Sequence, residues 1–262
     1  MMNRITPVVK NLLIINGILF LATYMFGSQL NFNLTKLLAL YYPGSQNFQP
    51  YQFVTYMFMH GGFAHIIFNM YALWLFGTAI ESSWGGKRFF IYYFFTGVGA
   101  ALLHVFVNYL TLDAIISAFN NSPSIGLFKL FVRAHGNYFN QNVYDFINQW
   151  SASPDNPVYA GKALRDMQWV YEKVINIPTV GASGAVFGIL LAFGMMYPNA
   201  QLMLLIPPIP IKAKWLVIGY GALEIILAFS RPGSNIAHFA HLGGMLFGYF
   251  LIRYWKSQRN SY

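Results

Sequence analysis

Residues 181–188 read Gly181-Ala182-Ser183-Gly184-Ala185-Val186-Phe187-Gly188, a glycine-rich octet with one hydroxyl group. An apolar run follows the octet and ends at Pro198. In a water-soluble protein this pattern would be typical of a tight turn that enters a helix. Here the octet lies among other long apolar segments, which predicts that its helix is buried in a membrane.

The composition of the whole chain supports a membrane location. Of its 262 residues, 56% are hydrophobic and only 9% are charged, whereas soluble domains carry roughly 25% charged residues. The net charge of +9 does not indicate a nucleic-acid partner, because the basic residues are scattered between apolar segments. The chain has no cysteine, which excludes disulfides and thiolate metal sites. We expect no metal and no other cofactor.

Several segments have the length and composition of membrane-spanning helices, which need about 20 mostly apolar residues. A polar insertion at residues 112–178 separates the third span from the fourth, and its parts 144–150 and 162–174 have helical periodicity. It is expected to form either a helical cap outside the membrane or a mobile loop. The sequence thus predicts an all-α polytopic membrane protein with a single domain, residues 1–262. The expected spans are 8–27, 62–80, 89–111, 183–197, 212–229 and 236–255.

The distribution of lysine and arginine predicts the orientation in the membrane, since cytoplasmic loops carry an excess of both. Basic residues gather at the two ends of the chain and in the loops after the second and fourth spans. Both termini are therefore expected in the cytoplasm and the insertion outside. The residues on the predicted inner side are Arg4, Lys10, Lys87, Arg88, Lys212, Lys214, Arg253, Lys256 and Arg259, against Lys36 and Arg231 in short outer loops.

The helix that begins with Ser183 is short. About 15 residues before Pro198 cover about 22 Å, against a hydrocarbon core of about 30 Å. If the helix is anchored at the cytoplasmic face, Ser183 lies roughly 8 Å below the outer surface. Irregular backbone at that depth is tolerated only when it is buried in protein or lines a water-filled cavity. The sequence therefore predicts a wet pocket that opens outward at Ser183.

The last span carries a histidine at matching depth. His241 is expected about 7–8 Å below the outer face by helical rise, and a serine becomes a useful nucleophile when a base takes its proton. Taken alone, the serine would be a packing residue and the histidine a hydrogen-bonded contact between helices. Both helices carry a GxxxG face that allows close approach, which favours catalysis instead. The glycines are Gly184 and Gly188 on one helix and Gly244 and Gly248 on the other.

The second span adds two hydrogen-bond donors on one face, because His65 and Asn69 are four residues apart on a helix. Polar groups inside a membrane usually face a cavity or the bundle interior. Acyl transfer needs donors aimed at the developing oxyanion, and the free N–H groups at a helix start add to them. Alone, the two residues would be explained by local hydrogen bonds. Beside Ser183 and His241 they predict an oxyanion hole.

These pieces resemble the rhomboid family of intramembrane serine proteases. The resemblance implies a six-helix bundle in which Ser183 is the nucleophile and His241 is the general base, a dyad without the carboxylate of soluble triads. The matching residues are Gly181-Ala182-Ser183-Gly184, Ala240-His241-Leu242-Gly243-Gly244 with Gly248, and His60, His65 and Asn69.

The resemblance also implies roles around the dyad. His65, Asn69 and the amide of the nucleophile correspond to the oxyanion hole, and Gly181 to the turn before the serine. Phe187 falls where the family places an aromatic ring against the histidine. His60 matches a position with a structural or substrate-binding role.

Two features depart from the family's pattern. Tyr51-Gln52 stands where many relatives have a Trp-Arg pair in the first outer loop, so the contacts of that arginine must be replaced. The other is the insertion at 112–178, which smaller bacterial members lack and to which the sequence assigns no task.

The remaining ionisable residues are expected to be structural. Glu224 lies inside an expected span, but nothing in the sequence aims it at His241, so we expect it to be packed or protonated. His238 precedes His241 by three residues and is expected at the rim of the pocket. Structural hydrogen bonds are expected for Glu81 and His104, and solvent exposure for His135.

The sequence therefore predicts a serine endopeptidase that cleaves transmembrane segments of protein substrates near the outer membrane face. Substrates would pass beside the span 212–229, and this span and the loop 230–235 are the movable elements expected to form a gate. The alternative is an inactive rhomboid-like protein that binds membrane clients without cleaving them, and the intact Ser183–His241 pair favours the enzyme. Apart from substrates, the expected partner is the lipid bilayer, with no nucleic acid and no metal. A multi-pass location in a bacterial inner membrane is expected.

Overall fold

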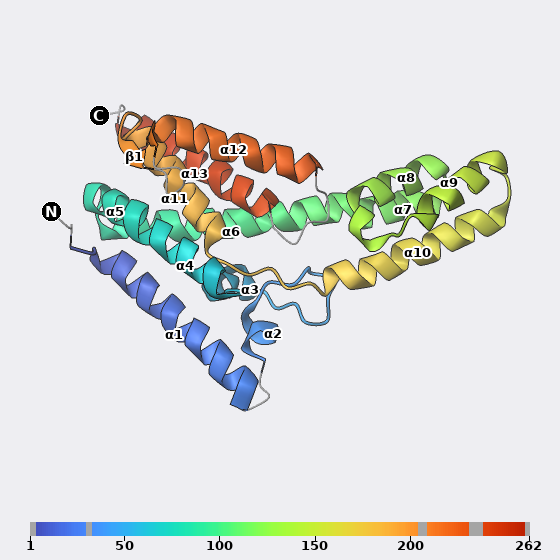
Figure 1. Cartoon of the computed structure of the whole chain (residues 1–262), viewed down its shortest axis with the longest axis horizontal. Coiled ribbons are helices and arrows are strands. Elements are labelled where there is room, and N and C mark those ends of the chain that lie inside the picture. The colour runs from blue at the N-terminus through green and yellow to red at the C-terminus, as the bar shows by residue number, and fades with distance from the viewer. Residues whose placement is uncertain (1–3, 30–32, 204–208, 231–237, 260–262) are drawn as a thin grey trace.

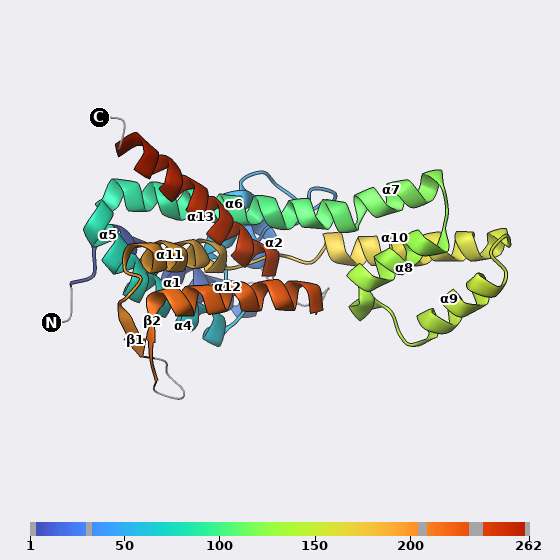
Figure 2. The ribbon, with the colours of Figure 1, turned by 90° about the horizontal axis from the view of Figure 1, so that it is seen from above.

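The computed structural model describes residues 4–29, 33–203, 209–230 and 238–259. Long helices pack into a bundle, and a second group of helices projects from one end of it (Figure 1). The start of α1 (Pro7–Gln29) and the end of α13 (His238–Arg259) both lie at the opposite end of the bundle (Figure 1 and Figure 2). Most of the loop of the predicted gate, residues 231–235, and residues 236–237 of the last expected span lie outside the described residues.

Four stretches of the described chain are long and apolar enough to cross a membrane: Pro7–Gly27, Phe63–Trp84, Gly86–Asn121 and Ala213–Ser230. The helices at the expected spans 183–197 and 236–255 do not meet this criterion of length and hydropathy. The first has only 14 residues, and the second carries polar and basic side chains in its C-terminal half. The count of six spans stays a prediction. The bundle helices are α1 (Pro7–Gln29), α4 (Phe63–Ala72), which continues through the π-helical turn η2 (Leu73–Gly77) into α5 (Thr78–Trp84), α6 (Gly86–Thr111), α11 (Ser183–Met196), α12 (Ala213–Ser230) and α13 (His238–Arg259).

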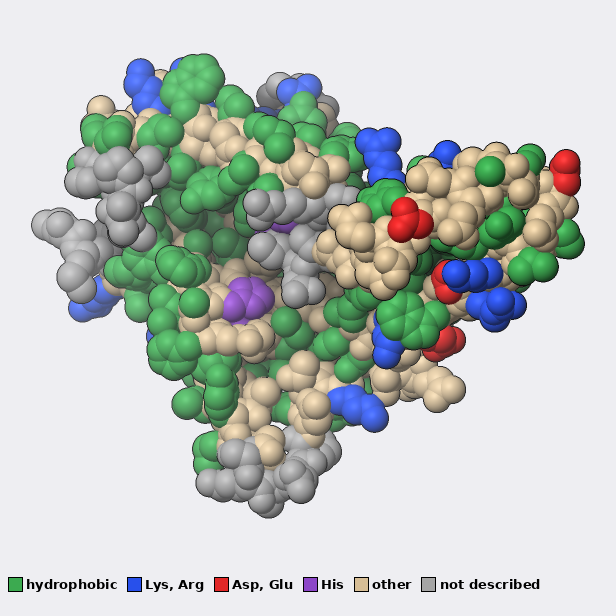
Figure 3. All heavy atoms as spheres, turned by 45° about the vertical axis from the view of Figure 1, so that its right-hand side comes forward, with side chains coloured by type: hydrophobic (Ala, Val, Ile, Leu, Met, Phe, Trp, Pro, Cys, Tyr) green, Lys and Arg blue, Asp and Glu red, His purple; other side chains and the backbone are tan. Residues whose placement is uncertain are grey.

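The segment between α6 and α11 is helical, and the regions 144–150 and 162–174 with helical periodicity lie within two of its helices. Aromatic and aliphatic side chains, among them Phe128, Phe131 and Met167, form a buried core separate from that of the bundle. Charged side chains of both signs lie on this segment, whereas much of the bundle surface is hydrophobic (Figure 3). Its elements are α7 (Asp113–Asn121), α8 (Ile125–Ala134), the 3-10 turn η3 (Gly136–Tyr138), α9 (Asn142–Ala152) and α10 (Pro157–Ile175).

Short elements connect the main helices. A two-stranded antiparallel hairpin, β1 (Gln201–Met203) and β2 (Pro210–Lys212), joins α11 to α12, with Gln201 opposite Lys212. Figure 2 shows this hairpin projecting to one side of the bundle. The first loop contains α2 (Leu34–Leu38), α3 (Gln52–Thr55) and the 3-10 turn η1 (Tyr56–Phe58).

Three helices, α6, α11 and α13, form the tightly packed centre of the bundle. A Cβ atom on Gly244 would overlap the carbonyl oxygen of Gly184, and one on Gly188 would lie 3.0 Å from the carbonyl oxygen of Gly244. The backbones of α11 and α13 therefore touch. Gly248 differs from the expectation, because it faces the hydroxyl of Tyr92 on α6 rather than α11. The glycines of α13 thus allow close contact with two helices.

A buried amide organises the first loop. The side chain of Gln52 is fully buried. Its Nε2 donates to the carbonyl oxygens of Leu37 and Asn47 at 3.2 and 2.9 Å. Its Oε1 accepts from the N–H groups of Tyr41 and Gln49 at 3.3 and 3.1 Å. These four bonds connect the two sides of the loop, at the position where the resemblance implies an arginine.

Glu81 holds the start of α1, and its predicted role as a structural acceptor is confirmed. Its carboxylate accepts from the hydroxyl of Thr6 at 2.6 Å and from the N–H groups of Val8 and Val9 at 3.0 and 2.9 Å. Thr6 directly precedes the helix, and the two N–H groups belong to its first turn, where such groups lack partners within the helix.

Candidate active site

Gly181 sets the backbone that leads into α11. Its φ of +127° is unfavourable for residues with a side chain. A Cβ there would also lie 2.8 Å from Nε2 of His65, so glycine is required for both conformation and space. The N–H of Gly181 donates to the carbonyl oxygen of Tyr56 at 3.0 Å, which ties this turn to the first loop. Ser183 then begins the helix.

The structure brings Ser183 and His241 together. The serine Oγ lies 2.8 Å from Nε2 of the histidine. The ring of Phe187, one turn further along α11, stacks on the imidazole with ring centroids 4.3 Å apart and an angle of 4° between the planes. This stacking restricts the orientation of the imidazole, so that its Nε2 faces the serine.

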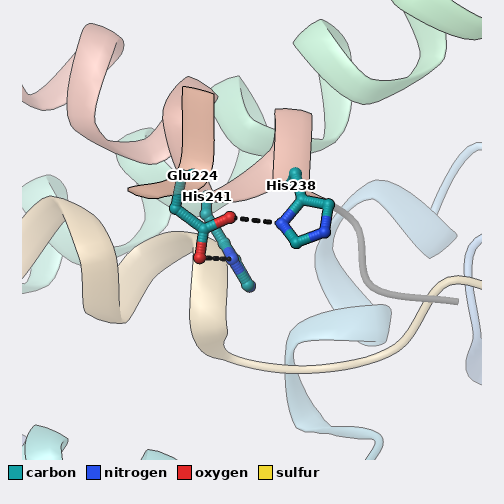
Figure 4. A group of neighbouring side chains, drawn as sticks. All are labelled: Glu224, His238 and His241. Atoms are coloured by element: carbon teal, nitrogen blue, oxygen red, sulfur yellow. Dashed lines mark hydrogen bonds and ion pairs between the residues drawn. The ribbon is translucent and has the colours of Figure 1, made fainter. Parts of the chain in front are cut away.

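A carboxylate lies on the other side of the imidazole (Figure 4). Oε1 of Glu224 is 3.0 Å from Nδ1 of His241, and Oε2 is 2.6 Å from Nδ1 of His238. Glu224 is buried, as expected of a packed residue, but its pairing with both histidines was not predicted. His238 is buried and lines the cavity that contains Ser183, in agreement with its expected place at the pocket. The sequence held one indication of this pairing, because ionisable groups in apolar spans usually pair with one another. Spacing alone could not reveal which partner each would face.

The same three residues resemble a donor set for a metal ion. Ligand atoms of Glu224, His238 and His241 all lie within 4.8 Å of one another, and Zn²⁺ uses histidine and carboxylate ligands. The carboxylate, however, already contacts both imidazoles directly at hydrogen-bond distances. The hydrogen bond between His238 and the carboxylate forms without an ion, and the absence of a metal stays a prediction.

His65 and Asn69 lie on α4 beside this group. Nδ1 of His65 accepts a long hydrogen bond of 3.4 Å from the N–H of Gly61. A neutral imidazole that accepts at Nδ1 carries its proton at Nε2, and Nε2 faces Gly181 next to the serine. Nδ2 of Asn69 donates one hydrogen to the carbonyl oxygen of His65 at 3.0 Å, which leaves its second hydrogen for another acceptor.

His60 packs behind His65. The two rings meet edge to face with centroids 5.1 Å apart. Burial lowers the pKa of His60 to about 4, and the neighbouring His65 contributes to the shift. His60 is therefore neutral at pH 7. These contacts are those of a residue that supports the His65 ring.

A family model for the rhomboid domain matches residues 47–127 and 158–257. The chain belongs to the rhomboid family. This confirms the resemblance drawn from the motifs, and membership together with the long apolar helices makes the protein an integral membrane protein. Rhomboids are usually intramembrane serine proteases, although inactive members exist. The match leaves out residues 128–157, so α9 and most of α8 have no counterpart in the rhomboid family model.

Two curated relatives show similarity over a large part of this rhomboid. Rhomboid protein 1, mitochondrial, of Saccharomyces cerevisiae is 24% identical over 206 residues, which cover 77% of the chain and 42% of the relative. Rhomboid-like protein 11, chloroplastic, of Arabidopsis thaliana is 26% identical over 167 residues, 58% of the chain and 55% of the relative. The chain thus spans about half the length of these relatives.

A cavity of about 1840 Å³ joins the site residues of this rhomboid to the insertion. Ser183, His241, His65 and Asn69 line one part of it. Leu130, Arg133, His135 and Tyr138, at the end of α8 and in η3, line another. The insertion therefore forms part of the wall of the cavity that leads to the serine. His104 also lines it and is hydrogen-bonded as expected, with Nε2 3.1 Å from Oγ1 of Thr179.

His135 is buried rather than solvated, contrary to expectation. Its ring lies against Phe131 with centroids 4.8 Å apart, and its Nε2 is 3.1 Å from the carbonyl oxygen of Thr111. The sequence indicated a polar environment, but the helices around this residue supply an apolar core. His135 thereby connects α8 to the end of α6.

Acidification is expected to loosen the insertion. Burial lowers the pKa of His135 below its usual 6.5, partly offset by the bond to Thr111. The unfolded segment binds a proton more readily, so the stability contributed by His135 is present above pH 6.5 and declines as the pH falls below it. Hydrogen exchange of residues 113–175, expressed as an opening free energy at each pH, should show several-fold lower protection at pH 5 than at pH 7. His135→Gln keeps a donor for Thr111 without the titration and should flatten this dependence. A similar decline in both proteins would contradict this assignment.

Proposed function

We propose that this rhomboid is an intramembrane serine endopeptidase that cleaves transmembrane segments of protein substrates near the outer membrane face. The observation that supports it most directly is the 2.8 Å contact between Ser183 Oγ and His241 Nε2 in a cavity among apolar helices. A nucleophile within hydrogen-bond reach of a base is the arrangement that acyl transfer requires.

The reaction follows from the positions of these two groups. Nε2 of His241 takes the hydroxyl proton as Oγ of Ser183 attacks the carbonyl carbon of the scissile peptide. The protonated imidazole then gives that proton to the leaving amine as the C–N bond breaks, and an acyl-enzyme forms. Water hydrolyses the ester in the reverse sequence, with the same histidine first as base and then as acid.

In this proposal, donors around the serine stabilise the oxyanion. His65 contributes Nε2–H, Asn69 contributes its remaining amide hydrogen, and the backbone N–H of Ser183 belongs to a helix start, where such groups have no partner within the helix. Other residues support the geometry. Gly181 shapes the turn, Phe187 orients the base, His60 packs behind His65, and Gly244 and Gly248 bring α13 to its neighbours.

We further propose one membrane domain, residues 1–262, with six spans, both termini in the cytoplasm, and residues 112–178 outside as an extramembrane insertion. The distribution of basic residues among the two ends of the chain and the short loops supports this orientation. A bacterial inner membrane is the proposed location, and the organelle names belong to the relatives. Neither a metal, another cofactor nor a nucleic acid takes part.

The second candidate is a rhomboid-like protein that binds membrane clients without cleaving them. It would have no need of a hydroxyl and an imidazole held at 2.8 Å with an aromatic ring fixing the imidazole. That arrangement favours the enzyme.

The proposal is tested in liposomes that contain the purified protein and a single-span substrate. Wild type should cleave the substrate, and a fluorophosphonate probe should label Ser183. Ser183→Ala should do neither. Ser151→Ala is the matched control, since this exposed serine in the insertion only donates to the carbonyl oxygen of Ile147. Client binding by wild type with no cleavage and no labelling would establish the second candidate instead.

A further inference from the structure

Two imidazoles and one carboxylate meet between α12 and α13, and the dyad chemistry uses only one of the three. Glu224 contacts Nδ1 of His241 at 3.0 Å with one oxygen and Nδ1 of His238 at 2.6 Å with the other. Nε2 of His241 is 2.8 Å from Ser183 Oγ. The contacts thus run without interruption from the serine through the imidazole to the carboxylate and on to the second histidine.

We propose that Glu224 is a positioning residue for His241, so that the site works as a Ser–His–Glu triad whose carboxylate is held in place by His238. The inference rests on the proposed function, because it assigns a role within the same reaction. It adds an orienting group that the dyad expected from the sequence lacks.

The chemical reason lies in the two tautomers of imidazole. A neutral histidine carries its proton on either ring nitrogen, and its partner determines which one. A carboxylate at Nδ1 favours the proton there, because a carboxylate only accepts hydrogen bonds. Nε2 then has a free lone pair directed at Ser183. When His241 takes the serine proton, the same carboxylate stabilises the resulting imidazolium.

His238 gives the carboxylate a fixed orientation. A carboxylate removed from water is costly unless it is paired and hydrogen-bonded. The 2.6 Å bond to His238 satisfies Oε2 and leaves Oε1 to face His241. Both imidazoles project from α13, whereas the carboxylate comes from α12. The residue that holds Glu224, His238, therefore lies on the same helix as the base, His241.

The contact with His241 is close but not well aligned. Nδ1 of His241 has no partner of good hydrogen-bond geometry among the described residues, although Oε1 lies at 3.0 Å. Catalytic hydrogen bonds are often poorly aligned in the unoccupied enzyme and tighten when substrate binds. The bond between His238 and Glu224, by contrast, is already well aligned. This is expected if His238 fixes the carboxylate before His241 becomes protonated.

The charge of Glu224 has a predictable effect on the pH dependence of the reaction. The groups that face His241 are Ser183 on α11, His65 on α4, His104 on α6 and, on its own helix, His238. None of these is an anion, so Glu224 supplies the negative charge among the described neighbours. Removal of that charge is expected to shift the acid limb of the rate profile, the pH range in which activity falls on acidification, to lower pH.

Glu224→Gln keeps the size of the side chain and removes its charge. In the liposome assay we expect kcat to fall about 10²-fold, the low end for impaired acid–base catalysis, with KM changed less than threefold. The acid limb of kcat/KM should move to lower pH. His238→Gln should give a smaller fall in kcat in the same direction, because Glu224 remains but loses its support.

A merely structural role would lower the fraction of folded enzyme and scale the whole profile without moving the acid limb. Glu81→Gln provides the matched control, since it removes another buried carboxylate, one that holds the start of α1. It should lower thermal stability without moving the limb. Activity should also be unchanged by a chelator, whereas activation by added Zn²⁺ that needs all three side chains would replace the triad with a metal site.

The outcomes separate this inference from the proposed function. If wild type fails to cleave and Ser183 is not labelled, the enzyme itself is refuted. If wild type cleaves through Ser183 while folded Glu224→Gln keeps its kcat and its acid limb, the dyad stands and the role of Glu224 is overturned.

Discussion

Ser183→Ala, His241→Ala and the double variant are expected to lose the same factor in kcat, about 10⁴- to 10⁶-fold. The equality follows because a nucleophile and its base act as a unit, so that removal of either stops the same step. A residual rate would come from substrate binding and oxyanion stabilisation. Single-turnover cleavage in liposomes measures all three variants without interference from product release.

The comparison is informative only for folded variants. Each should elute from size exclusion and unfold thermally like wild type, because the 2.8 Å bond between Ser183 and His241 joins two helices already in backbone contact. Losses that add in the double variant would show that the two residues act independently, which would refute the proposed proton transfer.

Gly244→Ala is expected to disrupt the bundle and abolish cleavage. The added Cβ would overlap the backbone carbonyl of Gly184, and a backbone atom, unlike the end of a flexible side chain, cannot move aside without shifting a helix. Overpacking of this kind typically costs about 1–3 kcal/mol and occasionally more. A displacement of about 1 Å at His241 would by itself reduce the rate about 10²-fold. Thermal unfolding in detergent and cleavage in liposomes measure the two effects.

Gly219→Ala is the matched control for this substitution. It lies on α12, where a Cβ would meet nothing within 4 Å, so unfolding temperature and activity should stay close to wild type. Gly248→Ala should fall between the two, because the obstructing atom is the hydroxyl of Tyr92 on a side chain. Wild-type stability in Gly244→Ala would contradict the close helix contact.

Much of the architecture follows from local patterns. Long apolar runs indicated helices in a membrane, and periodicity indicated helices inside the insertion. The octet predicted a helix that begins at Ser183, and α11 begins there. Such features depend on neighbours within a few residues along the chain, which is why they can be predicted without knowledge of tertiary contacts.

The partners of buried polar groups could not be predicted in this way. Glu224 and His135 were assigned from the character of their own segments, one apolar and one polar. The structure instead pairs Glu224 with two histidines of α13 and buries His135 at the C-terminal end of α8. The rotation of α12 about its axis determines which side chain reaches His241, and α12 has no strong polar stripe from which that rotation could be predicted. Gly248 shows the same limit, since it faces α6 rather than α11.

The octet and the histidine of the last span indicated the family, because the identity and spacing of serine, histidine and glycine are properties of the amino-acid sequence. The orientation of the imidazole depends on contacts that exist only after folding. Phe187 stacks on one face of the ring, and Glu224 reaches Nδ1 from another helix. These contacts join residues from three helices at distances of a few ångströms. Helix packing sets such distances, and no spacing along the chain specifies them.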